Sequence, residues 1–303
     1  MVFFVAVTSE APNRFPDAAQ EPTRPAYRDL LSLGERTLTA VERAQIRFVR
    51  RTFERPWMSD LASAHQRILG ASWVQLTTYN LTEVYGLDRF PRLTPSDSVI
   101  LVSNHRSFFD MYVLSCMLIK RLHMKKRLVF PVRSKFFYDS PAGLLVNGVM
   151  SAFAMYPPIF RERSRAALNI ASLDETIRLL RRGGVFLGMH PEGKRNQGDP
   201  YEFLPAQRGV GRILHECPNA KVVPVFINGL GNGFFQQIRD NFNGHGERVI
   251  AVFGEPIDFG AALKRPGSPK LHKELSDISM EHVRRLSVEE RTYRSMPHRD
   301  SRG

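Results

Sequence analysis

Cysteine is scarce in this sequence of 303 residues, with only Cys116 and Cys217 present. Cys116 lies inside an apolar helical pattern, so a disulfide framework is implausible and a reducing compartment such as the cytoplasm is favoured. The sequence also contains no internal repeat. It lacks a dense cluster of metal ligands at the usual spacings, so we expect neither a metal nor another cofactor.

A secretory signal is lacking as well. The first residues, MVFFVAVTSEAP, are apolar, but no cationic segment precedes them and the apolar run is too short for such a signal. Residues 8–26 are rich in Pro, Ala, Glu and Thr and show little periodicity. We therefore interpret residues 1–26 as a disordered tail.

Charge is absent from one long stretch, residues 140–160. Its length is sufficient to cross a bilayer. However, Pro141, Gly143 and the pair Pro157-Pro158 argue against a regular spanning helix. A buried helix that lines an apolar pocket, or a segment that dips into the membrane interface, fits these residues better.

Positive charge is in excess, since 43 Lys and Arg residues against 30 Asp and Glu residues give a net charge of +13. Such an excess indicates an anionic partner, which can be nucleic acid, a phospholipid surface or a phosphorylated substrate. No recognised nucleic-acid-binding signature is present, so no nucleic acid is expected. The hydrophobic content of 43% is ample for a folded core.

Residues 27–90 predict a helical hairpin. From Tyr27 to about Phe53 apolar residues recur at helical spacing, and arginines occupy much of the remaining surface. A second helical pattern runs from Met58 to Tyr79. The hairpin either packs on the main domain or lays its basic amphipathic face on anionic lipid, and both interpretations remain open.

After Pro91, short apolar strands alternate with helices. We expect strands at residues 98–103, 127–132, 184–189, 221–227 and 248–253, and helices at residues 108–120, 165–182 and 207–216. This alternation predicts an α/β domain over residues 91–262, with a largely parallel central sheet flanked by helices. An amphipathic C-terminal helix and a basic tail follow over residues 263–303.

Two polar segments each follow an expected strand. They are Asn104–Asp110 and His190–Arg195. Because ligands of parallel sheets gather beyond the carboxyl ends of the strands, we expect both segments at the same rim.

The first segment contains His105 and Asp110. On one helix their spacing would turn the two side chains about 140° apart, so they meet only if His105 lies in the loop before the helix. With Ser107 as the N-cap and Asp110 at the third helical position, the carboxylate can point back at the imidazole and fix its tautomer. The other ring nitrogen is then free to take a proton from a substrate hydroxyl. A simple capping arrangement is the alternative.

The second segment lies in GMHPEGKRNQGDP, residues 188–200, and places Glu192, Gly193, Lys194 and Arg195 in a turn. Gly193 lets backbone N–H groups approach a ligand closely, and the two cations can clamp a phosphate. A solvated surface loop is the alternative.

Taken together, these segments resemble the motifs of a known family. NHRSFFD and HPEGKR are similar to the N-H-x-S-x-x-D and P-E-G-x-R boxes of the glycerolipid acyltransferase family, of the lysophosphatidate (1-acylglycerol-3-phosphate) acyltransferase type. Further similar segments follow in the same order: FRERSR at 160–165 with Arg163 at the family's arginine position, QRG at 207–209, VVPVFING at 222–229 and FGEPIDF at 253–259. The resemblance covers about residues 95–260.

The resemblance implies transfer of an acyl group from acyl-CoA or acyl carrier protein to the hydroxyl of a lysophospholipid, with 1-acylglycerol-3-phosphate as the first candidate. It implies that His105 is the general base and that Asp110 orients it. The implied ligands of the acceptor phosphate are Arg163, Glu192, Gly193 and Arg195, and the supporting loop residues are Asn104, Ser107 and Lys194. It further implies a peripheral or monotopic protein at the cytoplasmic face of an anionic membrane, without a cofactor.

Departures from the family pattern leave the acceptor open. His190 stands where the family often has an aromatic or aliphatic residue, and Arg161 replaces an apolar one, so Arg161 or Arg165 could bind the phosphate in place of Arg163. The acceptor could then be another lysolipid, such as an amino-acid lipid or a glycolipid. Two other classes are a non-enzymatic basic protein that binds a membrane or nucleic acid, and a metal-assisted hydrolase that uses Asp110 and the two rim histidines.

Overall fold

The computed structural model of the chain describes residues 27–244 and 246–297. The tail expected over residues 1–26 lies outside them. Within them is a seven-stranded sheet in the order β1-β7-β6-β2-β5-β3-β4. The strands are β1 (Thr82–Tyr85), β2 (Val99–Ser103), β3 (Arg127–Arg133), β4 (Met155–Ile159), β5 (Val185–Met189), β6 (Lys221–Asn228) and β7 (Val249–Phe253). Every neighbouring pair is parallel except β6 and β7, so the predicted largely parallel α/β sheet is confirmed.

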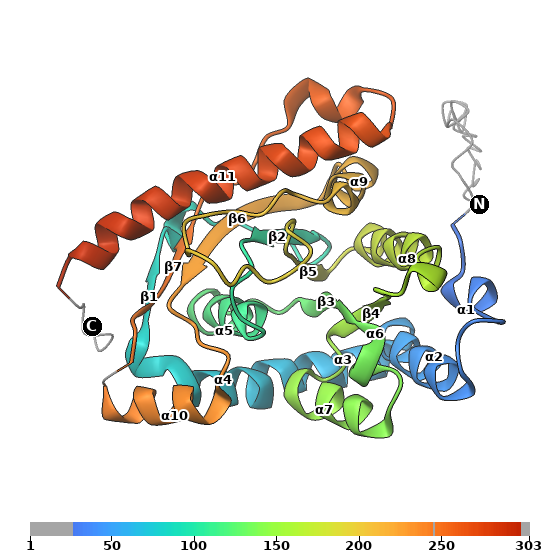
Figure 1. The fold of residues 1–303 in the computed structure, drawn as a ribbon, viewed down its shortest axis with the longest axis horizontal. Helices are drawn as coiled ribbons and strands as arrows, with labels where there is room; N and C mark the ends of the chain where they lie inside the picture. Colours follow the sequence, from blue (N-terminus) through green and yellow to red (C-terminus); the bar gives the residue numbers. More distant parts are fainter. Residues whose placement is uncertain (1–26, 245, 298–303) are drawn as a thin grey trace, which may run out of the picture.

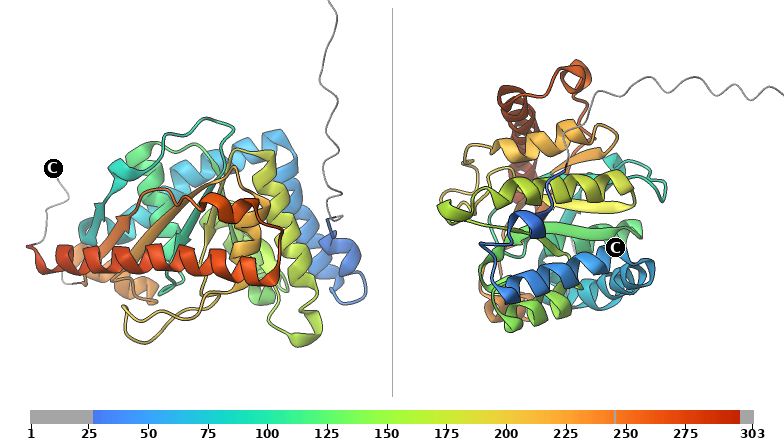
Figure 2. Two further views of the ribbon diagram at one scale, coloured as in Figure 1. Left: turned by 90° about the horizontal axis from the view of Figure 1, so that it is seen from above. Right: turned by 90° about the vertical axis from the view of Figure 1, so that its right-hand side faces the viewer.

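Helices cover both faces of the sheet (Figures 1 and 2). They are α1 (Leu30–Leu33), α2 (Ala40–Glu54), α3 (Pro56–His65), α4 (Ala71–Thr78), α5 (Asp110–Leu122), α6 (Ser134–Phe137), α7 (Pro141–Ser151), α8 (Leu168–Arg182), α9 (Arg208–Glu216), α10 (Phe234–Asn243) and α11 (Pro269–Ser295). Figure 1 shows α8, α9 and α11 on one side of the sheet and α5 on the other, with α2, α3, α4 and α7 beyond α5. The helices predicted at 165–182 and 207–216 and at the C-terminus are α8, α9 and α11.

The sheet separates two hydrophobic cores, because the side chains of a strand point alternately to its two faces. In β2, Ile100 and Val102 face the core shared with α8, α9 and α11. Val99 and Leu101 face the core shared with α4 and α5. A strand that is buried on both faces reads as a continuous apolar run, which is why this strand could be found in the sequence.

The two edge strands, β1 and β4, were not predicted from the sequence. β4 contains Pro157 and Pro158, which argue against a strand, but an edge position tolerates residues without an N–H donor. β1 is short and pairs with β7 at the opposite edge. Because β1 belongs to the sheet, the α/β unit begins before the expected boundary at residue 91.

The first helical pattern is divided into two helices. The hydroxyl of Thr39 accepts a hydrogen bond from the Glu42 N–H (3.2 Å), and the Glu42 carboxylate accepts one from the Thr39 N–H (2.8 Å). This capping box starts α2 as a separate helix, so the expectation of one helix over residues 27–53 is wrong at its beginning. The second pattern is confirmed as α3 and α4, joined by a π-helical turn at Gln66–Gly70.

The uncharged stretch 140–160 forms α7 and then β4. The buried side chain of Asn147 joins them, because it donates to the Met155 carbonyl (3.2 Å) and accepts from the Met155 N–H (3.3 Å). α7 lines an apolar cavity together with α2 and α3. Among residues 27–244 and 246–297, no helix combines the length and the apolar character needed to cross a membrane.

Candidate active site

The loop between β2 and α5 is fixed by bonds to two neighbouring segments. The buried side chain of Asn104 donates to the Ile227 carbonyl (2.8 Å) and accepts from the Ile227 N–H (2.9 Å). The carbonyl of His105 accepts from the Asn196 N–H (2.8 Å). The loop is therefore held between the end of β6 and the loop that follows β5, at the carboxyl-terminal rim of the parallel strands.

His105 and Asp110 meet in this loop. The Nδ1 atom of His105 lies 3.1 Å from Oδ2 of Asp110, whose side chain is fully buried. The same Oδ2 accepts from the backbone N–H groups of Arg106 (2.7 Å) and Ser107 (2.9 Å). The structure thus places the two side chains in contact, as their spacing predicts. Because Nδ1 faces Asp110, Nε2 is the nitrogen left to accept a proton.

The contact forms by a different local geometry from the one expected. α5 begins at Asp110, which is therefore not its third residue, and Ser107 is not the N-cap. The Ser107 hydroxyl instead donates to the Gly231 carbonyl (2.7 Å). Asp110 reaches back from the first turn of α5, and one buried oxygen accepts from three donors of the preceding loop.

Burial sets the charges of this pair. Burial, and then the positive charges of Arg195 and Arg161, lower the pKa of His105 to about 4. Burial raises the pKa of Asp110 to about 6, although the two backbone N–H groups act to lower it. At neutral pH the imidazole is therefore uncharged and the carboxylate is ionised. A neutral imidazole can accept a proton, and the carboxylate stabilises the imidazolium that forms.

His190 lies flat against His105. The ring centroids are 3.9 Å apart and the ring planes differ by 7°. Nδ1 of His190 donates to the Asn104 carbonyl (2.8 Å), and burial, followed by the charge of His105, lowers the pKa of His190 to about 3. His190 is thus neutral at pH 7, and its stacked ring restrains that of His105. The sequence indicated that these histidines share a rim, but not that they stack.

Metal ligation by this cluster can be tested against its geometry. Ligand atoms of His105, Asp110 and His190 lie within 4.8 Å of one another. Metals bind imidazole nitrogens at about 2.0–2.1 Å along the lone pair, which lies in the ring plane. Because the two rings are stacked, an ion in the plane of one ring lies outside the plane of the other. One Nδ1 is also engaged by a carbonyl and the other by the carboxylate, so the arrangement fits a base and its orienting group better than a metal centre.

The loop after β5 carries Glu192 and Gly193. Gly193 has a φ of +68°, and a Cβ there would come within 3.0 Å of the Gln207 side chain, so this turn requires glycine. Glu192 is buried, and burial raises the pKa of its carboxyl group to about 7, although interactions with the backbone N–H groups of His105 and Leu204 act to lower this pKa.

Cations surround the opening of the site. Arg195 is exposed, and its NH1 group donates to Oδ1 of Asn232 (2.9 Å). Arg161 is exposed as well, and Arg195 and Arg161 are the two charges that lower the pKa of His105. Lys194 is also exposed. An anion held near Arg195 and Arg161 would therefore lie close to the imidazole.

The other two arginines of the 160–165 segment are placed differently. Arg165 pairs with Glu42 (2.7 Å), and its guanidinium lies 4.5 Å from the centre of the Phe160 ring. Arg165 is therefore engaged in holding α2 to this segment. Arg163 is exposed and is not among the charges that shift the pKa of His105. Of the three arginines in this segment, Arg161 is the one whose charge lowers the pKa of His105.

The segment NGLGNG, residues 228–233, was not among the predicted site residues, yet Gly231 and Asn232 of this segment bond to residues of the site. Oδ1 of Asn232 accepts from Arg195 and from the backbone N–H of Phe108 (3.2 Å). Gly231 accepts from the hydroxyl of Ser107. Its density of Gly and Asn directly after a strand was the available signal, because such residues form tight loops at strand ends.

Residues 81–228 match the family model described as Acyltransferase. A search of curated proteins found no match. Among solved structures, the chain is similar to the 1-acyl-sn-glycerophosphate (LPA) acyltransferase PlsC from Thermotoga maritima, with 18% sequence identity and a TM-score of 0.46. That likeness covers 85% of this chain and 87% of the other. The family match spans both rim loops, so residues 81–228, which carry the candidate site, are similar to the acyltransferase family.

Proposed function

We propose that this protein transfers a fatty acyl group from an acyl thioester to the hydroxyl of a lysophospholipid. The observation that carries the proposal is the neutral imidazole of His105, held at 3.1 Å from the buried carboxylate of Asp110 within an acyltransferase domain. 1-Acylglycerol-3-phosphate is the simplest acceptor of this class, and its product is phosphatidate. Acyl-CoA and acyl carrier protein are the candidate donors.

The reaction needs one proton carrier. As the acceptor oxygen attacks the thioester carbonyl, Nε2 of His105 takes the hydroxyl proton, and Asp110 stabilises the imidazolium. Collapse of the tetrahedral intermediate breaks the carbon–sulfur bond, and the imidazolium returns the proton to the thiolate. The products are an ester and a free thiol, so the enzyme needs neither a redox partner nor a covalent intermediate. His190 keeps the His105 ring in place during both steps through its stacking contact.

The cations near the imidazole suit an acceptor that carries a phosphate. Arg195 and Arg161 lower the pKa of His105, so a phosphate bound to them would neutralise their effect and raise this pKa. The base would thereby become stronger when the acceptor is in place. In this proposal Arg195 and Arg161 hold the phosphate, with Lys194 and Arg163 at its exposed side. Glu192 would bind an acceptor hydroxyl, and Gly193 allows the turn.

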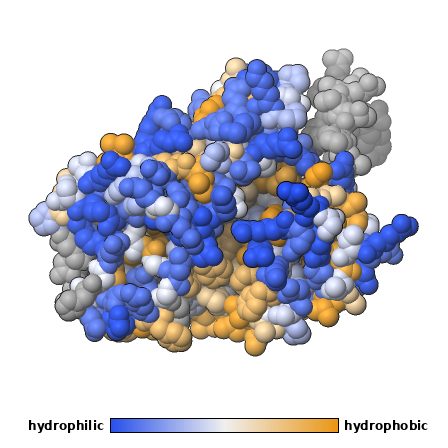
Figure 3. Space-filling view, in the orientation of Figure 1, coloured by the Kyte–Doolittle hydropathy of each residue, from blue (hydrophilic) through white to orange (hydrophobic). Residues whose placement is uncertain are grey.

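An apolar cavity of about 750 Å³ between α2, α3 and α7 is suited to an acyl chain. Apolar side chains also remain exposed around it. Trp57 on α3 is 66% exposed and Leu145 on α7 is 68% exposed, and further exposed residues of this surface are Leu61, Ile68, Leu69, Leu76 and Val149. Figure 3 shows hydrophobic side chains gathered along the lower edge of the molecule, where α4 and α7 lie. A contiguous apolar surface of this kind supports membrane docking.

In this proposal α3, α4 and α7 rest on the membrane. Arg50 of α2 is engaged inside the protein, because it pairs with Asp29 (2.6 Å) and lies 3.4 Å from Glu175, whereas Arg47 and Arg51 of the same helix are exposed. The region 27–90 is thus both a packed hairpin and a docking element. The protein would act as a peripheral or monotopic protein on the cytoplasmic membrane face, where acyl thioesters are available.

Docking can be tested with two paired variants. The double variant Leu61→Glu/Leu145→Glu should lose sedimentation with anionic vesicles, because it places charge on the apolar surface. Val288→Glu is the matched control, since Val288 is 65% exposed on α11, on the other side of the sheet. Equal sedimentation of the double variant and the control would contradict docking through α3 and α7.

The proposed reaction itself is tested with purified protein, labelled acyl-CoA or labelled acyl carrier protein, and a panel of lysophospholipids in vesicles. We expect a labelled diacyl product with at least one donor and one acceptor. Release of free fatty acid without any diacyl product would favour a hydrolase instead.

A further inference from the structure

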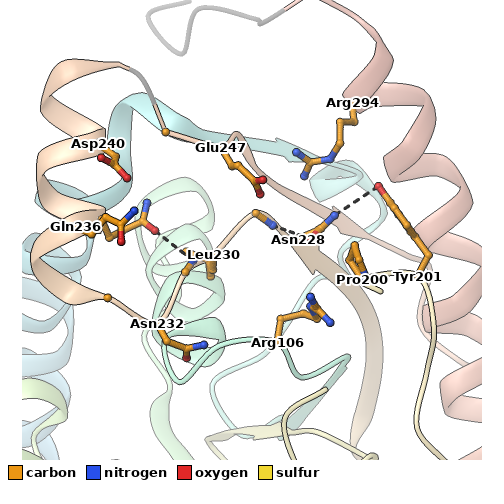
Figure 4. Close-up of a pocket in the computed structure, with 15 residues that line it drawn as sticks. Arg106, Pro200, Tyr201, Asn228, Leu230, Asn232, Gln236, Asp240, Glu247 and Arg294 are labelled. Atoms are coloured by element: carbon orange, nitrogen blue, oxygen red, sulfur yellow. Dashed lines mark hydrogen bonds between the residues drawn. The ribbon is translucent and has the colours of Figure 1, made fainter. Parts of the chain in front are cut away.

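A polar cavity lies beside the proposed catalytic loop, away from the apolar cavity. It has a volume of about 600 Å³ and opens between α10, α11 and the loop that follows β6 (Figure 4). Gln236 and Asp240 enter it from α10, and Arg294 enters from α11. Its size is in the range of pockets that enclose small molecules.

The lining of this cavity is rich in hydrogen-bonding groups and balanced in charge. Arg106 and Arg294 contribute positive charges, and Asp240 and Glu247 contribute negative ones. Carboxamides of Asn and Gln residues and backbone groups of several glycines make up much of the rest. Gln236 and Glu247 are exposed. Such a lining suits a ligand portion that has many polar groups and little net charge.

The cavity is connected to the proposed phosphate site through Asn232, which lines it. Oδ1 of Asn232 accepts from NH1 of Arg195 (2.9 Å) and from the N–H of Phe108 (3.2 Å). Arg106, the neighbour of His105 in sequence, lines the cavity too. Arg195 thus links the two, because its charge acts on His105 and its NH1 group bonds to a residue that lines this cavity.

We propose that the cavity binds the head group of the acceptor, and that the acceptor is a lysophospholipid whose phosphate is a diester bearing a small polar group that carries at most one positive charge. This inference rests on the proposed function and selects within its substrate class. A phosphate monoester such as lysophosphatidate ends at the phosphate and would leave the cavity unfilled. A glycerol or an ethanolamine group attached to the phosphate would reach the carboxamides and paired charges of the wall.

The test blocks the cavity without touching the proposed catalytic residues. Gln236→Trp places a large ring at the wall of the cavity, and Asn243→Trp is the matched control. Asn243 is exposed on the same helix and does not line the cavity. Kinetics with labelled acyl-CoA are measured for lysophosphatidate, lysophosphatidylglycerol and lysophosphatidylethanolamine in identical vesicles. Thermal melting verifies that both variants are folded.

We expect the wild-type protein to use at least one of the two diester acceptors with a higher kcat/KM than lysophosphatidate, and the preferred one identifies the head group. Gln236→Trp should lower kcat/KM for that acceptor at least about tenfold and leave lysophosphatidate within about twofold, whereas Asn243→Trp should change neither.

Three results would overturn the inference, and each differs from a failure of the proposed function. If the wild-type protein acylates lysophosphatidate but neither of the two diester acceptors, the reaction does not use a head-group site. An equal loss with every acceptor in Gln236→Trp, with a raised KM for acyl-CoA, would assign the cavity to the carrier of the donor. No effect of Gln236→Trp would leave the cavity without a role in acceptor choice. The proposed function fails only if no lysophospholipid of the panel is acylated with either donor.

Discussion

Replacing Asp110 with Asn removes one negative charge from the site and nearly preserves the shape of the side chain. The three hydrogen bonds to Asp110 all end on Oδ2. The carbonyl oxygen of Asn can therefore take that position, and its NH₂ group replaces Oδ1, which has no partner among the described residues. The variant keeps the orientation of His105 and loses the charge that stabilises its protonated form.

The size of the effect follows from the geometry. Unit charges at the 3.1 Å that separate Nδ1 from Oδ2 attract each other by about 5 kcal/mol at an effective dielectric constant of about 20. Because about 1.4 kcal/mol corresponds to a factor of ten in rate, this attraction sets an upper limit of about four powers of ten on the loss of kcat. Partial exposure of His105 reduces it, so we expect kcat to fall by about 10² to 10⁴. The buried NH₂ group should cost about 1–3 kcal/mol of folding stability.

The assay is formation of labelled diacyl product from labelled acyl-CoA at saturating acceptor, with thermal melting as the control for folding. If the Asp110→Asn variant is folded and its kcat lies within about tenfold of wild type, the charge of Asp110 does not stabilise the protonated form of His105 during the reaction. This result would mean that the carboxylate organises the loop but does not assist proton transfer.

Three further predictions follow from the same site. Arg195→Ala should raise KM for the phosphate-bearing acceptor and leave KM for the thioester nearly unchanged; the reverse pattern in a two-substrate kinetic analysis would assign Arg195 to the donor. The acid limb of kcat/KM should lie between about pH 4 and pH 6, the pKa values of His105 and Asp110. Arg161→Gln should move this limb to higher pH, since loss of a nearby positive charge makes protonation of His105 easier. A pH–rate profile in which the limb is unmoved or lies at lower pH would contradict this prediction. Exhaustive chelation should leave the rate unchanged. A loss of activity that one metal ion restores would instead support a metal-assisted hydrolase that uses His105, Asp110 and His190.

The centre of the fold was predictable because its strands are buried on both faces. β2 appears in the sequence as an apolar run, and β6 as a largely apolar run that contains Pro224; the parallel arrangement then placed Asn104–Asp110 and His190–Arg195 at one rim. The edge strand β4 was not predictable, since its two prolines argue against a strand wherever edge position is unknown. Edge position depends on the order of strands, which local sequence does not encode.

The same distinction between local and long-range features applies to the candidate site. The contact of His105 with Asp110 could be predicted because both lie in one short segment, although its details could not. The stacking of His190 on His105 and the bond from Arg195 to Asn232 join segments far apart in the chain. Their geometry depends on the sheet register, so the sequence could indicate a shared rim but not these contacts. For the same reason the sequence left Arg161, Arg163 and Arg165 as alternatives for binding the phosphate.

Proton transfer to His105 is the central step of the proposed mechanism, and one measurement tests it most directly. The rate of labelled diacyl lipid formation is compared for wild-type protein and His105→Ala in the same lysophospholipid vesicles, at equal amounts of folded, vesicle-bound protein. We predict that the substitution lowers the rate at least about a hundredfold while vesicle binding is unchanged. A variant that still forms the product at more than about a tenth of the wild-type rate would contradict the role of His105 as the base.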